Sequence, residues 1–247
     1  MTPMSCAPMG DSVPESLFVG RQKEIERVCD ELRGRHNLVL TGRFGMGRTT
    51  LLRHLARERK DEWRFIFLNG SLTAAKICEA LHLALFPGVL GPEPGKRLSW
   101  KTQRHQIGDR PNRGRRALVV VLDDIAKVTR QRLDFIRWLN DLDTFRIIAV
   151  TEPFLPEAGL ISLRIALCPA PVILLEPLSP AKAKLFFEAW AEQQGMAWND
   201  DQVHGLVLAT HGYPLGMTEA VKSLGDGSGP AWPADPPALE GKVGRPG

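Results

Sequence analysis

The sequence lacks the features of a membrane-spanning or secreted protein. Its longest apolar run, residues 165–175, is interrupted by Pro169 and Pro171 and falls well short of the roughly 20 apolar residues that a membrane span needs. Residues 1–16 contain no basic start followed by an apolar block, so we expect no secretory signal. We therefore expect a cytoplasmic protein without a membrane partner.

Cysteine is scarce and shows no pattern of metal or disulfide sites. The four cysteines, Cys6, Cys29, Cys78 and Cys168, include no Cys-x-x-Cys pair. This scatter favours reduced thiols in a cytosol over a disulfide framework or a zinc site. The six histidines have no metal-ligand spacing, and neither a Gly-x-Ser-x-Gly turn nor a catalytic Cys–His pattern is present.

What the chain has is an ordinary composition, with 247 residues of which 43% are hydrophobic and 24% charged. This apolar share is enough for a packed core, and the length fits one large or two small domains. The ends, residues 1–16 and 225–247, show almost no apolar periodicity and are expected to be a disordered leader and tail. Between them we expect a core over 17–176 and a helical lid over 177–224.

Apolar periodicity predicts strands that alternate with helices through the core. This alternation favours an α/β fold in which helices cover a parallel sheet. After Ser179 the pattern is purely helical and indicates three helices. Ser179 is the expected cap of the first, with Pro180 in its first turn, Asn199 or Asp200 is the expected cap of the second, and Pro214 is expected to begin the third. The expected strands are 37–40, 64–68, 117–122, 146–150 and 172–175, and the expected core helices are 22–32, 48–59, 72–86 and 130–142.

A glycine-rich loop directly follows the first expected strand. Residues 42–49 fit the pattern G-x-x-x-x-G-K-[ST], except that Arg48 stands at the lysine position. In such a loop, backbone N–H groups surround phosphate oxygens at the start of a helix. A cation at position 48 would meet the β- and γ-phosphates, and the hydroxyl of Thr49 would bind Mg²⁺. The alternative is an ordinary strand–helix connection. The binding positions in the loop would be Gly42, Gly45, Met46, Gly47, Arg48, Thr49 and Thr50.

Two carboxylates follow the aliphatic run at residues 118–122. Asp123 and Asp124 would lie at the carboxyl end of a buried strand, which is where open parallel sheets bind ligands. Asp123 is placed to hold Mg²⁺, and Asp124 to orient or deprotonate an attacking water. The alternative is an acidic turn that merely ends a strand. Because the phosphate loop and the acidic strand end occur together and in the expected order, we favour a nucleotide site.

These motifs resemble those of P-loop ATPases of the AAA+ and STAND type, close to their origin-recognition-like branch. The resemblance covers about residues 17–224. Leu17–Glu24 is similar to the family's F-V-G-R-x-x-E entry, in which the backbone near Val19 and Gly20 lines the adenine pocket. The resemblance implies a three-layer P-loop NTPase core with a sheet of order 5-1-4-3-2, and a nucleotide, ATP or ADP, between this core and a C-terminal helical lid.

Further residues match the family in order along the chain. The glycine-rich loop resembles Walker A, and Leu122–Asp124 resembles Walker B, where the doubled Asp is more typical of STAND proteins. Thr151 stands at the position of the polar sensor that detects the γ-phosphate. Leu178–Pro180 resembles the start of the lid, and His211–Leu215, which contains Pro214, is similar to the G-x-P signature of the last lid helix.

Arg48 is the main departure from the family pattern. A planar guanidinium here replaces the compact ammonium of lysine, and two outcomes are open. The guanidinium reaches the γ-phosphate and supports slow turnover, or it binds the nucleotide without aligning it for attack. Asp124 is shorter than the usual glutamate, and Glu152 is a second candidate for placing water or else a surface carboxylate. No firm arginine finger is evident; the candidates Arg130, Arg132, Arg137 and Arg164 are more simply solvated surface charges.

Basic residues gather in one segment, residues 96–116, within the connection from the third helix to the Walker B strand. This segment has a net charge of +7, whereas the whole chain has +4. With Trp100 and His105 interleaved, it is either a nucleic-acid contact or a solvated insertion. The residues expected to contact nucleic acid are Arg97, Lys101, Arg104, Arg113, Arg115 and Arg116.

Three hypotheses follow from the sequence. The protein is a slow ATPase, or a nucleotide-dependent switch or binding module with negligible turnover, or a DNA-associated accessory ATPase similar to those of replication or transposition. In each case the cofactors are ATP or ADP and Mg²⁺. A homo-oligomer or a protein partner fits all three. Asp124, Arg48 and Thr151 are the residues that we expect to act in catalysis.

Overall fold

The computed structural model describes residues 18–88, 98–110 and 116–225, and within them five strands form one parallel sheet of order β2-β3-β4-β1-β5. Counted from the other edge, this is the predicted order 5-1-4-3-2, so the predicted fold class is confirmed. The strands are β1 (Leu38–Gly42), β2 (Trp63–Asn69), β3 (Ala117–Ile125), β4 (Phe145–Thr151) and β5 (Val172–Leu175).

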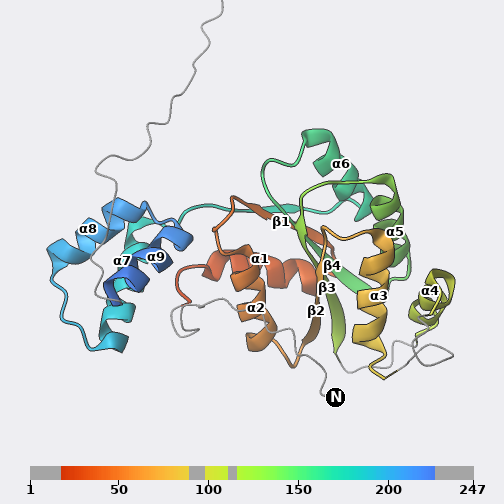
Figure 1. Cartoon of the computed structure of the whole chain (residues 1–247), viewed down its shortest axis with the longest axis horizontal. Helices are drawn as coiled ribbons and strands as arrows, with labels where there is room; N and C mark the ends of the chain where they lie inside the picture. Colours follow the sequence, from red (N-terminus) through yellow and green to blue (C-terminus); the bar gives the residue numbers. More distant parts are fainter. Residues whose placement is uncertain (1–17, 89–97, 111–115, 226–247) are drawn as a thin grey trace, which may run out of the picture.

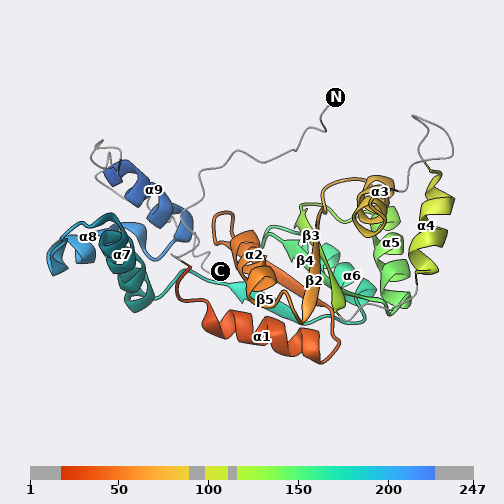
Figure 2. The ribbon, with the colours of Figure 1, turned by 90° about the horizontal axis from the view of Figure 1, so that it is seen from below.

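Helices cover both faces of the sheet, as Figures 1 and 2 show. One face packs on α1 (Gln22–Arg33) and α2 (Arg48–Glu58), and the other on α3 (Ala74–Leu85), α5 (Arg130–Asp141) and α6 (Glu157–Ala166). The central strands are aliphatic along almost their whole length because both of their faces are buried. Each helix predicted in the core is present within about two residues of its expected ends.

One further helix, α4 (Trp100–Gly108), which is not among the expected helices, lies inside the basic segment. The side chain of Ser99 caps its first turn, and Ile107 is fully buried in the core cluster that α3 also joins. The ring of Trp100 packs on that of Phe135 in α5, with 5.6 Å between the ring centroids. The segment is therefore anchored to the sheet domain at its centre.

Three helices follow the sheet and form their own apolar core. They are α7 (Pro180–Gln194), α8 (Asp200–Thr210) and α9 (Pro214–Gly225). Ser179 caps α7, as predicted, and Asn199, one of the two predicted candidates, caps α8 through a capping box. In Figures 1 and 2 this helical group lies at one end of the molecule, opposite to α4.

The domain limits drawn from the sequence stay predictions. The expected leader, residues 1–16, and all of the expected tail except Gly225 lie outside the described residues. Among the described residues, no helix has both the length and the apolar character that crossing a membrane requires.

Candidate functional site

The loop between β1 and α2 has the backbone geometry that the glycine pattern predicts. Gly45 and Gly47 both have φ near +79°, in the left-handed region that glycine adopts without a steric penalty. Gly47 is the N-cap of α2, and no side chain caps this helix end. A Cβ atom built on Gly47 would meet no atom within 4 Å. Among the described residues, no side chain therefore occupies the N–H groups at the start of α2, as an anion site at a helix start requires.

The loop and the acidic strand end meet directly. Thr49, in the first turn of α2, donates a hydrogen bond of 2.8 Å from its hydroxyl to the Oδ2 atom of Asp123, which lies 74 positions later in the chain. Asp123 follows Leu122 at a shift in the register between β3 and β4. The structure thus brings together the two residues that the sequence predicted as metal ligands. Both offer oxygen atoms, the donors that Mg²⁺ prefers.

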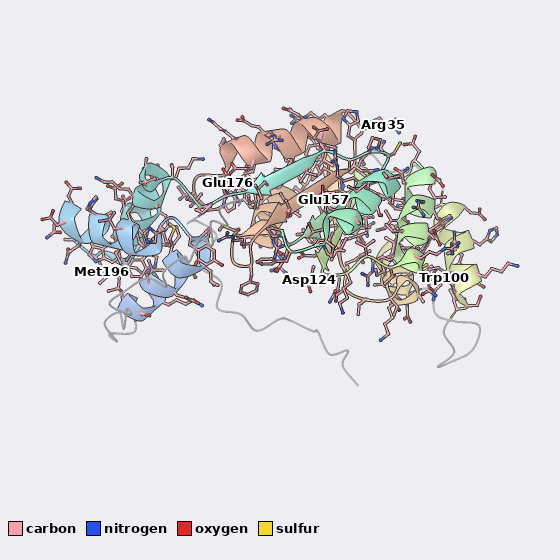
Figure 3. All side chains as sticks on the ribbon, turned by 90° about the horizontal axis from the view of Figure 1, so that it is seen from above. Arg35, Trp100, Asp124, Glu157, Glu176 and Met196 are labelled. Carbon is pink, nitrogen blue, oxygen red and sulfur yellow. The ribbon has the colours of Figure 1, made fainter. Side chains whose placement is uncertain are left out.

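Asp124 stands at the same edge of the sheet, where Figure 3 labels it. Its backbone has φ of +61°, which is uncommon for a residue other than glycine, and its side chain is exposed. Its backbone N–H donates to the Oδ1 atom of Asp123 over 3.0 Å. Because this bond and the bond from Thr49 use different oxygens, the carboxylate of Asp123 is oriented from two sides.

The side chain of Arg48 is bound at the end of β4. Its Nη2 atom lies 3.0 Å from the Oε1 atom of Glu152, and its Nη1 atom donates to the backbone carbonyl of Thr151. The side chain of Arg48 is 11% exposed. Glu152, expected to be either a water-placing group or a surface carboxylate, is instead the ionic partner of the residue at the Walker A lysine position.

Thr151 has a polar atom that is buried without a hydrogen-bond partner among the described residues. The residue is 1% exposed, and its Oγ1 atom is one of three such side-chain atoms. A buried hydroxyl of this kind costs about 1–3 kcal/mol if it stays unsatisfied. Its place beside Arg48, at the carboxyl end of β4, favours an additional group there, either a water molecule or a bound ligand.

The lid contacts the glycine-rich loop. The hydroxyl of Tyr213 donates to the carbonyl of Phe44, and the backbone N–H of Leu215 donates to the carbonyl of Gly45 over 3.1 Å. A Cβ on Gly45 would lie 2.7 Å from the Cβ of Leu215, so only glycine permits this approach. The predicted contact residue Pro214 begins α9 between these two contacts.

A second contact holds the loop from the entry segment. Arg21, which is 5% exposed, donates to the carbonyl of Met46 over 3.2 Å and pairs with Glu24 at 2.9 Å. Among the other predicted residues, Val19 packs against the lid core, and Gly20 lies so close to Lys182 of α7 that a Cβ would meet its side chain at 3.0 Å. The predicted adenine-pocket residues therefore stand where the core meets the lid.

Sequence reasoning missed Arg21 and Tyr213 as residues that hold the loop. Each had a signal: Arg21 is part of the matched entry motif, and Tyr213 is the only tyrosine in the chain and part of the matched lid motif.

The remaining predicted loop residues differ in exposure. Met46 is buried in the cluster of α1 and α2, Gly42 ends the buried strand β1, and Thr50 is exposed on α2.

One of the arginine-finger candidates is not a solvated surface charge. Arg132 is 7% exposed, and its Nη2 atom donates to the carbonyls of Ser71 and Leu72 over 3.0 and 2.9 Å. Burial lowers the pKa of its guanidinium. Arg132 therefore links the loop after β2 to the start of α5. The expectation of a solvated surface charge was wrong for this residue, because its guanidinium donates to backbone carbonyls inside the protein.

The basic segment has a different surface from the one expected. The guanidinium of Arg104 lies 4.3 Å from the ring centre of Trp138 and 5.7 Å from that of Trp100, so both rings are engaged within the protein. Trp100 is half-buried and packs on Phe135, so its ring is not freely available to stack on a nucleic-acid base. Arg116 donates to the carbonyl of Lys60. Arg97, Arg113 and Arg115 lie outside the described residues.

A family model described as an AAA ATPase domain matches residues 17–150, which is more than half of the chain. A search of curated proteins gave no match. The matched range includes the entry motif, the glycine-rich loop and the acidic strand end, and it finishes at the residue before Thr151.

Solved structures share this fold at low sequence identity. The Orc1 protein of Aeropyrum pernix, in complex with DNA, has a TM-score of 0.62 and 17% identity, over 87% of this chain and 62% of that one. Cdc6p of Pyrobaculum aerophilum has a TM-score of 0.60 and 18% identity, over 90% of this chain and 65% of that one. A STAND protein of Pyrococcus horikoshii with a tetratricopeptide repeat sensor has a TM-score of 0.51 and 18% identity, over 84% of this chain and 30% of that one. The chain thus spans less than two thirds of the length of each.

Proposed function

Since the chain belongs to the AAA ATPase domain family, we propose that it binds an adenine nucleotide, ATP or ADP, together with Mg²⁺ at the loop between β1 and α2. The observation that carries this proposal is the hydrogen bond of 2.8 Å between Thr49 and Asp123, which joins the phosphate loop to the acidic strand end. The uncapped start of α2 supports the proposal because it offers free N–H groups to phosphate oxygens.

The residues at this edge of the sheet fit a hydrated Mg²⁺ ion. Thr49 and Asp123 would hold it through oxygen atoms, and a magnesium ion bound there would neutralise negative charge on the phosphates. Among the described residues, no group of three or more His, Cys, Asp and Glu side chains could hold a metal ion by itself. We therefore expect the ion to enter together with the nucleotide.

Turnover by this site is expected to be slow. Asp124 would orient the attacking water, and the hydroxyl of Thr151 would contact the γ-phosphate or that water. Arg48 is paired with Glu152 at the end of β4, which favours a nucleotide-dependent switch over an efficient ATPase. Movement of the lid through its contacts with Phe44 and Gly45 would then report which nucleotide is bound.

Titration calorimetry with ATP and with ADP tests the proposed function. We expect both nucleotides to bind in the presence of Mg²⁺, and binding to weaken about tenfold when EDTA removes the ion or when Asp123→Asn removes a charged ligand. Asp134→Asn is the matched control, because Asp134 is an exposed carboxylate on α5 that pairs with Arg137. If neither nucleotide binds to the folded wild type, the proposal is wrong.

A second candidate function is that of a DNA-associated accessory ATPase. It is supported by the charge of +7 on residues 96–116, and a protein of similar fold, the Orc1 protein of Aeropyrum pernix, was solved in complex with DNA. Self-association or a protein partner fits this function and also the switch.

The reduced thiols expected from the scattered cysteines support a cytoplasmic location.

A further inference from the structure

The guanidinium of Arg48 is committed to two acceptors at the end of β4. Arg48 begins α2, and Glu152 directly follows β4, the strand that pairs with β1 on the side away from β5. The ion pair of 3.0 Å joins side chains that are 11% and 33% exposed. One nitrogen donates to the carboxylate of Glu152 and the other to the carbonyl of Thr151, so both Nη atoms of the guanidinium are held at the end of β4.

This commitment has an electrostatic consequence for any phosphate that enters the loop. Arg48 is the basic residue at the position where the Walker A pattern places a cation for the β- and γ-phosphates. Glu152 offsets that positive charge, at an edge that already carries the carboxylates of Asp123 and Asp124. A phosphate that is to gain Arg48 as a partner therefore competes with the carboxylate of Glu152 for this cation.

From these contacts we infer that Glu152 is a positioning residue that competes with the terminal phosphate for Arg48 and so makes the site favour ADP over ATP. The inference rests on the proposed function. The γ-phosphate is the group affected because Arg48 is held beside Thr151, which stands at the position expected to detect that phosphate. ADP lacks the γ-phosphate, so we expect its binding to depend less on Glu152 than the binding of ATP does.

The test compares the dissociation constants of ATP and ADP, with Mg²⁺, in the full chain and in Glu152→Gln. Glutamine has the same shape but no charge, so we expect ATP to bind about tenfold more tightly and ADP to change less than threefold. Glu157→Gln is the matched control, because Glu157 is an exposed carboxylate five positions later, at the start of α6 (Figure 3). It should leave both constants unchanged.

A double-mutant cycle separates this role from a purely structural one. In an Arg48→Lys background the side chain is one bond shorter and lacks the fork, so the effect of Glu152→Gln on ATP binding should fall below threefold. A structural role would change both backgrounds equally. Glu152→Ala serves as the second variant if the thermal midpoint of Glu152→Gln is lowered, and it should shift the preference in the same direction.

The outcomes separate this inference from the proposed function. Equal changes for ATP and ADP in Glu152→Gln, or no change for either, overturn the inference while nucleotide binding by the wild type upholds the proposed function. An effect of the same size in the Arg48→Lys background also overturns it. If the folded wild type binds neither nucleotide, the proposed function fails and the inference fails with it.

Discussion

At the scale of single residues, the exchange of lysine for arginine at position 48 changes what the loop can reach. A lysine ammonium is compact and can turn between the β- and γ-phosphates, whereas the planar guanidinium of Arg48 matches a carboxylate and a carbonyl at the end of β4. The charge is kept, but its position is set by Glu152. Arginine is therefore not a conservative replacement in this loop.

We expect Arg48→Lys to raise the rate of ATP hydrolysis by about tenfold or more, because an ammonium at this position can follow the charge that develops on the γ-phosphate. Steady-state release of phosphate at saturating ATP measures it. Arg53→Lys, the same change at an exposed position of α2, is the control and should leave the rate unaltered. An unchanged rate in Arg48→Lys, with nucleotide binding retained, would contradict the expectation.

At the scale of elements, the junction between the sheet and the lid depends on one glycine. Gly212 has φ of +67°, and its carbonyl accepts a hydrogen bond of 2.8 Å from the backbone N–H of Leu178. A Cβ at this position would lie 1.9 Å from the carbonyl oxygen of Leu178. The turn between α8 and α9 therefore fits against the segment before α7 only if residue 212 has no side chain.

Gly212→Ala should lower the free energy of unfolding by about 2–4 kcal/mol, since backbone strain at positive φ and displacement of Leu178 add together. Gly195→Ala is the matched control. Gly195 has φ of +66° at the end of α7 but no atom within 4 Å of a built Cβ, so only strain of about 1 kcal/mol applies. Urea denaturation followed by circular dichroism measures both, and equal losses would show that crowding at Leu178 is unimportant.

Two helices could not be predicted from the sequence, and each has a physical reason. The helix α4 has only nine residues in a strongly basic stretch, and its stability comes from packing Ile107 and Trp100 on α3 and α5. The helix α6 has no capping side chain, and it exposes Ile161 and Ile165. Its apolar residues therefore do not follow the single-face pattern that identifies a surface helix.

The candidate site was predictable where its residues lie in contiguous motifs, and not where they meet only through long-range side-chain contact. Thr49, Asp123 and Thr151 lie in contiguous motifs at the ends of expected strands, and a parallel sheet brings such ends to one edge. The pair of Arg48 and Glu152 is different. The predicted sheet order already makes β4 the neighbour of β1, but the pair also depends on side-chain reach between residues 104 positions apart, which no local pattern encodes.

At the scale of the whole molecule, charge is unevenly divided. Residues 96–116 have a net charge of +7, and the rest of the chain sums to −3. In Figure 1 the described part of this segment, α4, lies at the opposite end of the molecule from the lid. Any nucleic acid bound by α4 would therefore contact the sheet domain at the end away from the lid.

We expect binding of duplex DNA at low salt that weakens steeply as salt is added, with a slope of about −0.9 per phosphate contact. Changing Arg113, Arg115 and Arg116 to alanine should remove about three units of that slope. The control changes Lys23, Arg27 and Arg53, exposed residues of α1 and α2, and should leave the slope as it is. Fluorescence anisotropy measures both, and no binding at low salt would exclude the DNA-associated function.

The contact between Tyr213 and Phe44 gives the protein a built-in spectroscopic reporter. Tyr213 is the only tyrosine among 247 residues, and its hydroxyl bonds to the glycine-rich loop from the lid. Protein grown with ring-fluorinated tyrosine would therefore carry fluorine at a single place, where the two parts of the molecule touch. One fluorine NMR resonance would follow the opening and closing of this contact without any substitution in the chain.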